Sequence, residues 1–171
     1  QKSTTKIRCE KATELASGKT SVYWCHFNDE GDLLQTLDKE AIQIKGGDSL
    51  EKKEDILMNF ANGSIKRLIT KPKITSFGLN WQHCNHTVYF PTWSYEQYYQ
   101  AIRRFWRFGQ TNKVTVDLVV SDGQERVLDA LKYKTQKAIE FNKSIQSAIN
   151  KAVNTDTNKE FNKALIIPSF I

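Results

Sequence analysis

The feature that most constrains the fold is a regular alternation of short apolar runs with longer segments of helical periodicity. The short runs are rich in β-branched and aromatic residues, which favours strands at residues 21–26, 41–44, 67–70, 87–90 and 114–120. Apolar residues recur at helical spacing in residues 2–17, 28–37, 48–60, 94–107 and 122–153. This alternation predicts an α/β sandwich with a mainly parallel central sheet. Ligands of such sheets bind beyond the carboxyl ends of the strands.

Residues that cap or stop helices stand at several of the expected helix ends. Asn28 or Asp29 is a candidate cap for the second helix, and Asp48 or Ser49 for the third. Gly18 is a candidate stop for the first helix. We expect a helical lead-in, an α/β lobe, a closing helix and an irregular tail, at residues 1–20, 21–121, 122–153 and 154–171 respectively.

The chain carries 25 Lys and Arg residues against 19 Asp and Glu, a formal net charge of +6. This excess favours a polyanionic partner such as nucleic acid or nucleotide phosphates, although many basic proteins bind neither. No stretch has the ~20 consecutive apolar residues that cross a bilayer, and the N-terminus lacks the layout of a secretory signal. We therefore expect a cytoplasmic protein without membrane contact. Because the sequence begins at Gln1 rather than Met, we also expect a fragment or a processed chain.

The three cysteines, Cys9, Cys25 and Cys84, are odd in number and widely spaced. That pattern argues against a disulfide framework and favours a reducing cytosol. Cys and His occur together at residues 25–26 and 83–86, but neither group has the residue gap of a zinc knuckle. No metal site is therefore expected.

The most informative segment is Q-A-I-R-R-F-W-R-F-G-Q, residues 100–110, in which three arginines are interleaved with large aromatic residues. At helical spacing Gln100, Arg104 and Arg107 fall near one face, because offsets of three and four residues meet on a helix. Guanidinium groups anchored by aromatic packing suit two-pronged hydrogen bonds to phosphate oxygens. Composition alone leaves open the alternative of a surface helix paired with acidic neighbours.

This segment resembles motif six of superfamily-two helicases, and its ending R-x-x-R-x-G-Q resembles the form typical of Swi/Snf-type translocases. The resemblance implies a RecA-like three-layer sandwich with a long C-terminal helix, the second lobe of a DNA-dependent ATPase. It also implies that Arg104 and Arg107 are arginine fingers for the terminal phosphate of ATP, and that Gln100 contacts the nucleotide. A preplaced cation of this kind is often worth ~10³ or more in rate. We assign no role to Arg103.

Other segments resemble the family's motifs in the expected order, so that the resemblance covers roughly Val22 to Phe141. Residues 22–30 resemble motif four, and I-T-K-P-K-I-T-S-F-G-L-N-W-Q at 69–82 resembles motif five. Motif five touches both nucleotide and nucleic acid in the family, which implies nucleotide contacts for Gly78 and Asn80. Thr75 and Ser76 depart from the pattern, which commonly has glycines there. The amino-acid sequence of residues 69–84 also resembles that of a phage or bacterial branch of the family.

The same resemblance implies a DNA-binding edge. Lys71 and Lys73 are electrostatic candidates for contact with backbone phosphates, and Thr70 and His26 lie at the same edge of the predicted sheet. The implied partner is DNA, bound through its backbone with little sequence specificity. Alternatively, both lysines are solvated loop residues.

The G-K-T at residues 18–20 resembles the end of a phosphate-binding loop, but Thr13 stands where that loop needs glycine and no strand leads into it. An acidic box for magnesium is also missing. In the family both features belong to the N-terminal RecA-like lobe. The resemblance therefore implies that this lobe holds ATP and Mg²⁺, and that the present chain alone hydrolyses ATP negligibly. Two alternatives remain: a non-catalytic nucleic-acid-binding module of RecA-like fold, and a structural α/β domain with a fortuitous basic helix.

Overall fold

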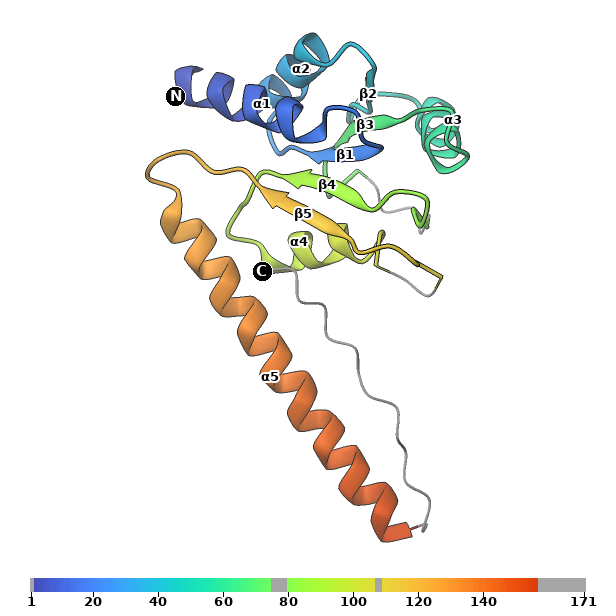
Figure 1. The fold of residues 1–171 in the computed structure, drawn as a ribbon, viewed down its shortest axis with the longest axis vertical. Coiled ribbons are helices and arrows are strands. Elements are labelled where there is room, and N and C mark those ends of the chain that lie inside the picture. Colours follow the sequence, from blue (N-terminus) through green and yellow to red (C-terminus); the bar gives the residue numbers. More distant parts are fainter. Residues whose placement is uncertain (1, 75–79, 107–108, 157–171) are drawn as a thin grey trace.

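The fold is described from a computed structural model that covers residues 2–74, 80–106 and 109–156 (Figure 1). Helices and strands alternate along the chain as predicted. Their order is α1 (Lys2–Ala16), β1 (Ser21–Trp24), α2 (Asn28–Leu37), β2 (Ala41–Gln43), α3 (Leu50–Ala61), β3 (Arg67–Thr70), β4 (His86–Tyr89), α4 (Tyr95–Ile102), β5 (Thr115–Leu118) and α5 (Glu125–Asp156).

The strands form one sheet of order β2-β3-β1-β4-β5, in which every neighbouring pair is parallel. At its centre Val22 of β1 lies opposite Leu68 of β3 and Thr87 of β4. The predicted α/β fold with a parallel central sheet is confirmed. All carboxyl ends of the strands therefore lie along one edge, where the sequence places the candidate DNA contacts.

Helices cover both faces of this sheet, so that the molecule has three layers (Figure 1). Successive strand side chains point to opposite faces, and β1 shows the consequence. Val22 and Trp24 pack with α3 and α4, whereas Tyr23 and Cys25 pack with α1 and α2. β1 is consequently buried throughout, as central strands of parallel sheets usually are. The two cores contain, among others, Ile56, Leu57, Phe60, Tyr98, Ala101 and Ile102 on one face, and Cys9, Ala12, Ala16 and Leu34 on the other.

Two predicted helix ends are confirmed. Ser49 caps α3, and its hydroxyl accepts a hydrogen bond from the backbone N–H of Lys52 at 3.2 Å. Gly18 follows α1 with a φ of 72°, a left-handed conformation that glycine adopts without steric cost.

The predicted cap of α2 is wrong. Phe27 occupies the cap position, so Asn28 and Asp29 lie inside the helix. The carboxylate of Glu30 instead reaches back to the loop before the helix, where its Oε2 accepts the backbone N–H groups of His26 at 3.0 Å and Phe27 at 3.1 Å. This is the glutamate half of a capping box, and Phe27 offers no side-chain acceptor for the other half.

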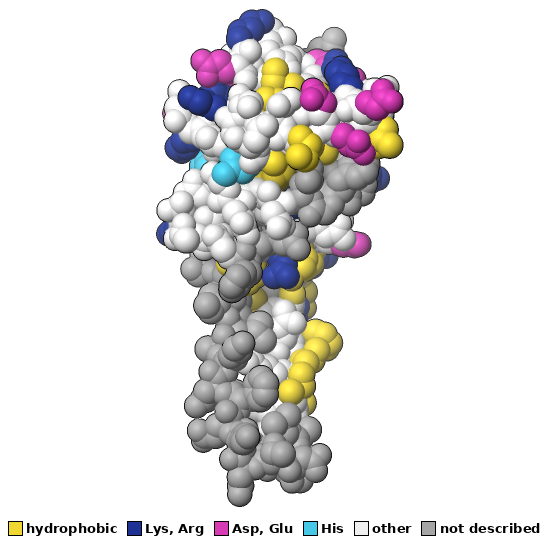
Figure 2. Space-filling view, turned by 90° about the vertical axis from the view of Figure 1, so that its right-hand side faces the viewer, with side chains coloured by type: hydrophobic (Ala, Val, Ile, Leu, Met, Phe, Trp, Pro, Cys, Tyr) yellow, Lys and Arg dark blue, Asp and Glu magenta, His cyan; other side chains and the backbone are white. Residues whose placement is uncertain are grey.

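The helix α5 extends well beyond the layered body (Figure 1). Its first part contacts α4; Val127 and Leu131 are buried, and Leu131 belongs to the core that α4 covers. Farther along, Phe141, Ile145 and Ile149 are exposed, and Figure 2 shows hydrophobic side chains at the surface of this projecting part. None of the described helices is long and apolar enough to cross a membrane.

Candidate functional site

The arginine segment begins as the helix α4. Ser94 caps this helix by accepting the backbone N–H of Gln97 at 3.3 Å, and Tyr98, Ala101 and Ile102 bury its inner face. The helix ends at Ile102, and the following residues form turns whose N–H groups still bond to its last carbonyls. The prediction of one helix over residues 94–107 is therefore wrong. Gln100 and Arg104 do not share a helical face.

Arg104 is held against the end of the motif-five segment. Its carbonyl oxygen accepts the backbone N–H of Trp81 at 3.1 Å, and its guanidinium carbon lies 5.5 Å from the Trp81 ring centre. Both contacts involve the same residue pair, so they fix the direction in which the half-buried side chain leaves the turn. Phe105 anchors the turn, because its ring packs on those of Trp24 and Trp81 in the core.

Arg103 occupies a different environment. Its guanidinium carbon lies 5.8 Å from the Tyr99 ring centre and 5.3 Å from that of Trp106. The residue is exposed and points along the outer side of α4, in contrast to Arg104. The two adjacent arginines are thus a natural pair for comparison, since only Arg104 contacts the motif-five segment through Trp81.

The Gly-Gln ending of the segment has a structural role that the sequence did not reveal. The side-chain amide of Gln110 donates to the carbonyl oxygen of Gln82 at 3.0 Å and also lies 3.3 Å from those of Cys84 and Phe105. Gly109 has a φ of 96°, and a Cβ there would lie 3.0 Å from the Gln82 amide nitrogen. Gly109 and Gln110 thus hold the end of the motif-six segment against Gln82, at the end of the motif-five segment.

The remaining candidate nucleotide contacts are less constrained. Gln100 is exposed and donates to the Glu96 carboxylate at 3.1 Å. Asn80 is exposed beside Trp81. Gly78 and Arg107, the other two candidates, lie outside the described residues.

The candidate DNA contacts gather where β1 and β3 end. Lys71 follows β3 directly, and its ammonium donates to the Asn28 side chain at 2.5 Å. Lys73 is exposed, whereas Thr70 is fully buried and contributes its carbonyl oxygen to the backbone N–H of Cys25 at 3.0 Å. Of these three residues only the lysines are charged, and Thr70 fixes the end of β3 through its carbonyl group.

His26 lies at the same edge and is partly buried. Its ring meets that of Tyr89 edge-on at 5.6 Å, and burial lowers the pKa of the imidazole, an effect that the nearby Glu30 carboxylate opposes. His26 is therefore favoured as the neutral form. Its Nε2 atom is buried and has no hydrogen-bond partner among the described residues.

A buried ion pair fixes this edge to α1. The Glu30 carboxylate, which caps the loop of His26, also accepts from the guanidinium of Arg8 at 2.8 Å. Glu30 is 2% exposed and Arg8 lies over the ring of Phe90, 5.1 Å from its centre. The loop after β1 is thus held by Glu30 of α2, which in turn is held by Arg8 of α1.

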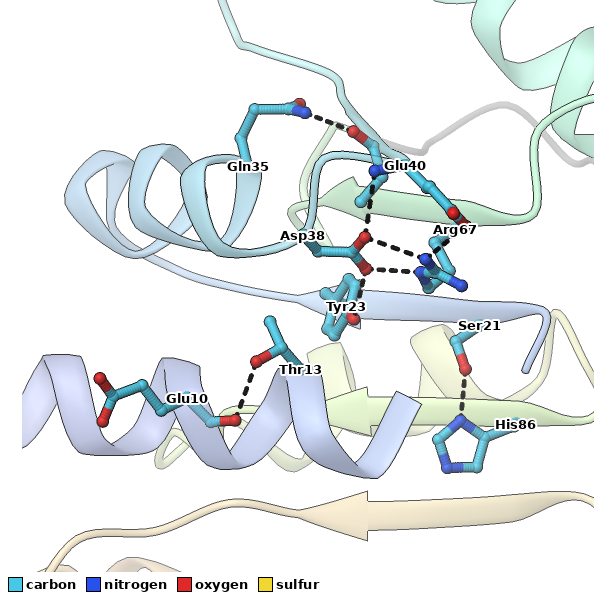
Figure 3. Close-up of polar contacts among 10 residues, drawn as sticks. Glu10, Thr13, Ser21, Tyr23, Gln35, Asp38, Glu40, Arg67 and His86 are labelled. Carbon is cyan, nitrogen blue, oxygen red and sulfur yellow. Dashed lines mark hydrogen bonds and ion pairs between the residues drawn. The ribbon is translucent and has the colours of Figure 1, made fainter. Parts of the chain in front are cut away.

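The opposite edge of the sheet carries polar networks of a structural kind (Figure 3). Asp38 accepts from Tyr23 at 2.8 Å and from the Arg67 guanidinium at 2.5 Å, and it lines an open pocket of about 330 Å³. Burial by itself would raise the pKa of Asp38, but the hydrogen bonds from Arg67 and Tyr23 outweigh it and lower the pKa. The Asp38 carboxylate is therefore engaged by Tyr23 and Arg67.

In the same region His86 connects three strands. Its Nδ1 lies against the hydroxyl of Ser21, and its Nε2 lies 2.8 Å from the Asp117 carboxylate and 3.4 Å from the Lys19 ammonium. The order Ser–His–Asp resembles a nucleophilic triad, but Ser21 is fully buried within β1, so no substrate reaches its hydroxyl. The described residues contain no group of three or more His, Cys, Asp or Glu side chains that is arranged to hold a metal ion.

Comparison with known proteins identifies the family of the chain. Residues 5–109 match the family model described as helicase conserved C-terminal domain. The chain is 32% identical over 135 residues to DNA repair protein RAD5 of Yarrowia lipolytica, which covers 75% of this chain and 13% of that protein. It is 30% identical over 100 residues to the bifunctional helicase and thymine dioxygenase JBP2 of Leishmania infantum, covering 57% of this chain and 9% of that protein. The chain thus spans only a small part of these relatives.

A solved structure supports the fold. The crystal structure of the C-terminal part of the Fun30 ATPase domain superposes with a TM-score of 0.62 at 20% identity, covering 74% of this chain and 45% of that one. The expected RecA-like layered fold is confirmed by this likeness.

Proposed function

The chain belongs to the helicase conserved C-terminal domain family, and we propose that it is the second motor lobe of a Swi/Snf-type, DNA-dependent ATPase. The observation that carries the proposal is the contact between Arg104 and Trp81, which joins the two segments matching motifs six and five. A phage or bacterial origin stays a prediction, since the relatives above come from a yeast and from Leishmania.

In this proposal Arg104 and Arg107 contact the terminal phosphate of ATP held by an N-terminal RecA-like lobe. Stacking on Trp81 uses the flat face of the Arg104 guanidinium, whereas the N–H groups lie in its plane and suit phosphate oxygens. A cation already fixed in place stabilises charge on the transferring phosphoryl group without reorganisation. Gln100, Gly78 and Asn80 contribute further contacts to the nucleotide.

Arg104 offers a guanidinium, which binds phosphate oxygens and does not coordinate metal ions. We therefore propose that Mg²⁺, which neutralises phosphate charge in such reactions, and most of the ATP are bound by the first lobe. The chain alone is expected to bind nucleotide weakly and to hydrolyse it negligibly. Its turnover is to be compared with that of the same chain joined to a first lobe; comparable rates would contradict the division of the site.

The DNA partner is proposed to lie along the carboxyl edge of β1 and β3. Lys71 and Lys73 supply charge to its backbone phosphates, the neutral His26 lies beside them at the same edge, and Thr70 holds the strand end in position. Binding through phosphates is insensitive to base sequence and weakens as salt rises, because counterions are released.

The second candidate function is a RecA-like module that grips nucleic acid without catalysis. The basic charge and the lysines at the sheet edge would serve it equally well. The two functions differ in what Arg104 does. A module that only binds would lose DNA affinity together with any activity when this residue is removed, whereas a motor lobe would lose turnover alone.

A further inference from the structure

Phe27 is exposed at the carboxyl edge of the sheet, and packing of the core does not account for an apolar side chain at this position. It lies between β1 and α2 and is 68% exposed. Apolar side chains scattered singly on a surface need no explanation, but the backbone that carries this one is fixed by hydrogen bonds. Its backbone N–H and that of His26 both donate to Glu30, and Glu30 is in turn paired with Arg8.

Two lysines lie near Phe27, together with the exposed carboxylate of Asp29. The side-chain oxygen of Asn28, the neighbour of Phe27, accepts a hydrogen bond from the Lys71 ammonium at 2.5 Å. Lys73, two residues after Lys71, has an exposed side chain. The nearby Asp32 carboxylate is paired with Lys45 at 2.8 Å. An exposed aromatic ring on a hydrogen-bonded backbone therefore stands near two lysine side chains. These are the two elements with which proteins bind strands of nucleic acid: the ring stacks on a base and the cation tracks the backbone.

We propose that Phe27 stacks on a nucleobase of the bound DNA while Lys71 contacts an adjoining phosphate. The inference rests on the proposed function, since it requires that this edge contact nucleic acid. The base can come from an unpaired strand or from a base step that the aromatic side chain opens in a duplex, and the stacking chemistry is the same in both.

The test measures binding of the 171-residue chain to a labelled oligothymidine of about 12 nucleotides, within the range of single-strand site sizes. A strand of equal length and charge with abasic sites serves as the matched ligand. Phe27→Ala is expected to weaken binding to oligothymidine about tenfold or more and to leave binding to the abasic strand unchanged. Phe27→Trp should retain binding.

Phe141→Ala is the matched control variant, because Phe141 is 64% exposed on α5, away from the sheet edge. It should bind both strands as the unmodified chain does. A thermal midpoint equal to that of the unmodified chain confirms that Phe27→Ala is folded. A duplex of the same length separates the sources: a loss on the duplex that matches the loss on the single strand indicates an opened base step.

Equal affinity of Phe27→Ala and the unmodified chain for oligothymidine would overturn the inference, and so would an equal loss on the abasic strand. Lys71→Ala combined with Lys73→Ala tests the proposed DNA edge separately. If this double variant reduces affinity and salt dependence while Phe27→Ala does not, only the stacking inference fails. If the unmodified chain binds neither strand at low salt, the proposed DNA edge fails with it.

Discussion

The backbone N–H of Trp81 donates to the carbonyl oxygen of Arg104, and the Arg104 guanidinium lies over the Trp81 ring. Trp81 is fully buried between Trp24, Phe60 and Phe105, with ring centres 5.4 to 5.7 Å from its own. The orientation of the candidate arginine finger therefore depends on the core of the domain. A side chain placed in this way leaves the turn in one direction before any ligand arrives.

The first prediction concerns this support. Trp81→Ala should lower the free energy of unfolding by about 3–5 kcal/mol, because it empties a large buried volume. Trp93→Ala makes the same chemical change at an exposed position and should alter it by less than about 0.5 kcal/mol. Urea unfolding measures both. Similar values for the two variants would contradict the central packing of Trp81.

The second prediction concerns the ion pair of Arg8 and Glu30. Removing one partner by Glu30→Gln or Arg8→Met leaves an uncompensated buried charge, which should cost about 3–5 kcal/mol. The exposed pair of Lys11 and Glu14, 2.9 Å apart, is the matched control, and Glu14→Gln should cost at most about 1 kcal/mol. Equal effects of Glu30→Gln and Glu14→Gln in urea unfolding would show that the link to α1 adds nothing to stability.

The third prediction concerns pH. Burial lowers the pKa of His86 below its ordinary 6.5, which the hydrogen bond with Asp117 opposes and the charge of Lys19 reinforces. The unfolded chain then binds more protons than the folded one just below pH 6.5, so stability should fall as pH decreases through 6.5 toward the lower folded pKa. Burial lowers the pKa of His26 as well, and partial desolvation against Phe60 lowers the pKa of the more exposed His83, so both act in the same direction.

Urea unfolding at a series of pH values tests this dependence. His86→Asn should flatten the profile below pH 6.5 more than His83→Asn does, because His86 is 4% exposed whereas His83 is exposed. A profile that stays level or rises as the pH decreases through this range would contradict the assignment of neutral histidines.

The sequence predicted the architecture because hydrophobic periodicity reflects burial directly. The run R-L-I-T gave β3 with its correct bounds, Arg67–Thr70, and the alternation with helices gave the parallel sheet. Helix ends were harder to predict. α4 stops at Ile102 because the chain turns to bury Phe105 and to give the Arg104 carbonyl to Trp81. These are contacts between distant segments, which local spacing does not contain.

The candidate site was predictable only in part for the same reason. The motif-six resemblance of residues 100–110 pointed to Arg104 rather than Arg103, but the sequence did not show what holds the Arg104 side chain in place. The structure does so through Trp81, which is remote along the chain. Likewise, the role of Glu30 as cap of its own loop could not be read from a position inside a helix.

The central claim is that Arg104 acts in turnover and not in DNA binding, and Arg104→Ala tests it most directly in a protein where this chain follows a first lobe. DNA-stimulated ATP hydrolysis should fall by about 10³-fold or more while the affinity for DNA is retained. Arg104→Lys should restore little of the rate, because lysine lacks the planar fork, and Arg103→Ala should leave most of it. An equal loss of hydrolysis and DNA affinity in Arg104→Ala, or full turnover in that variant, would contradict the claim.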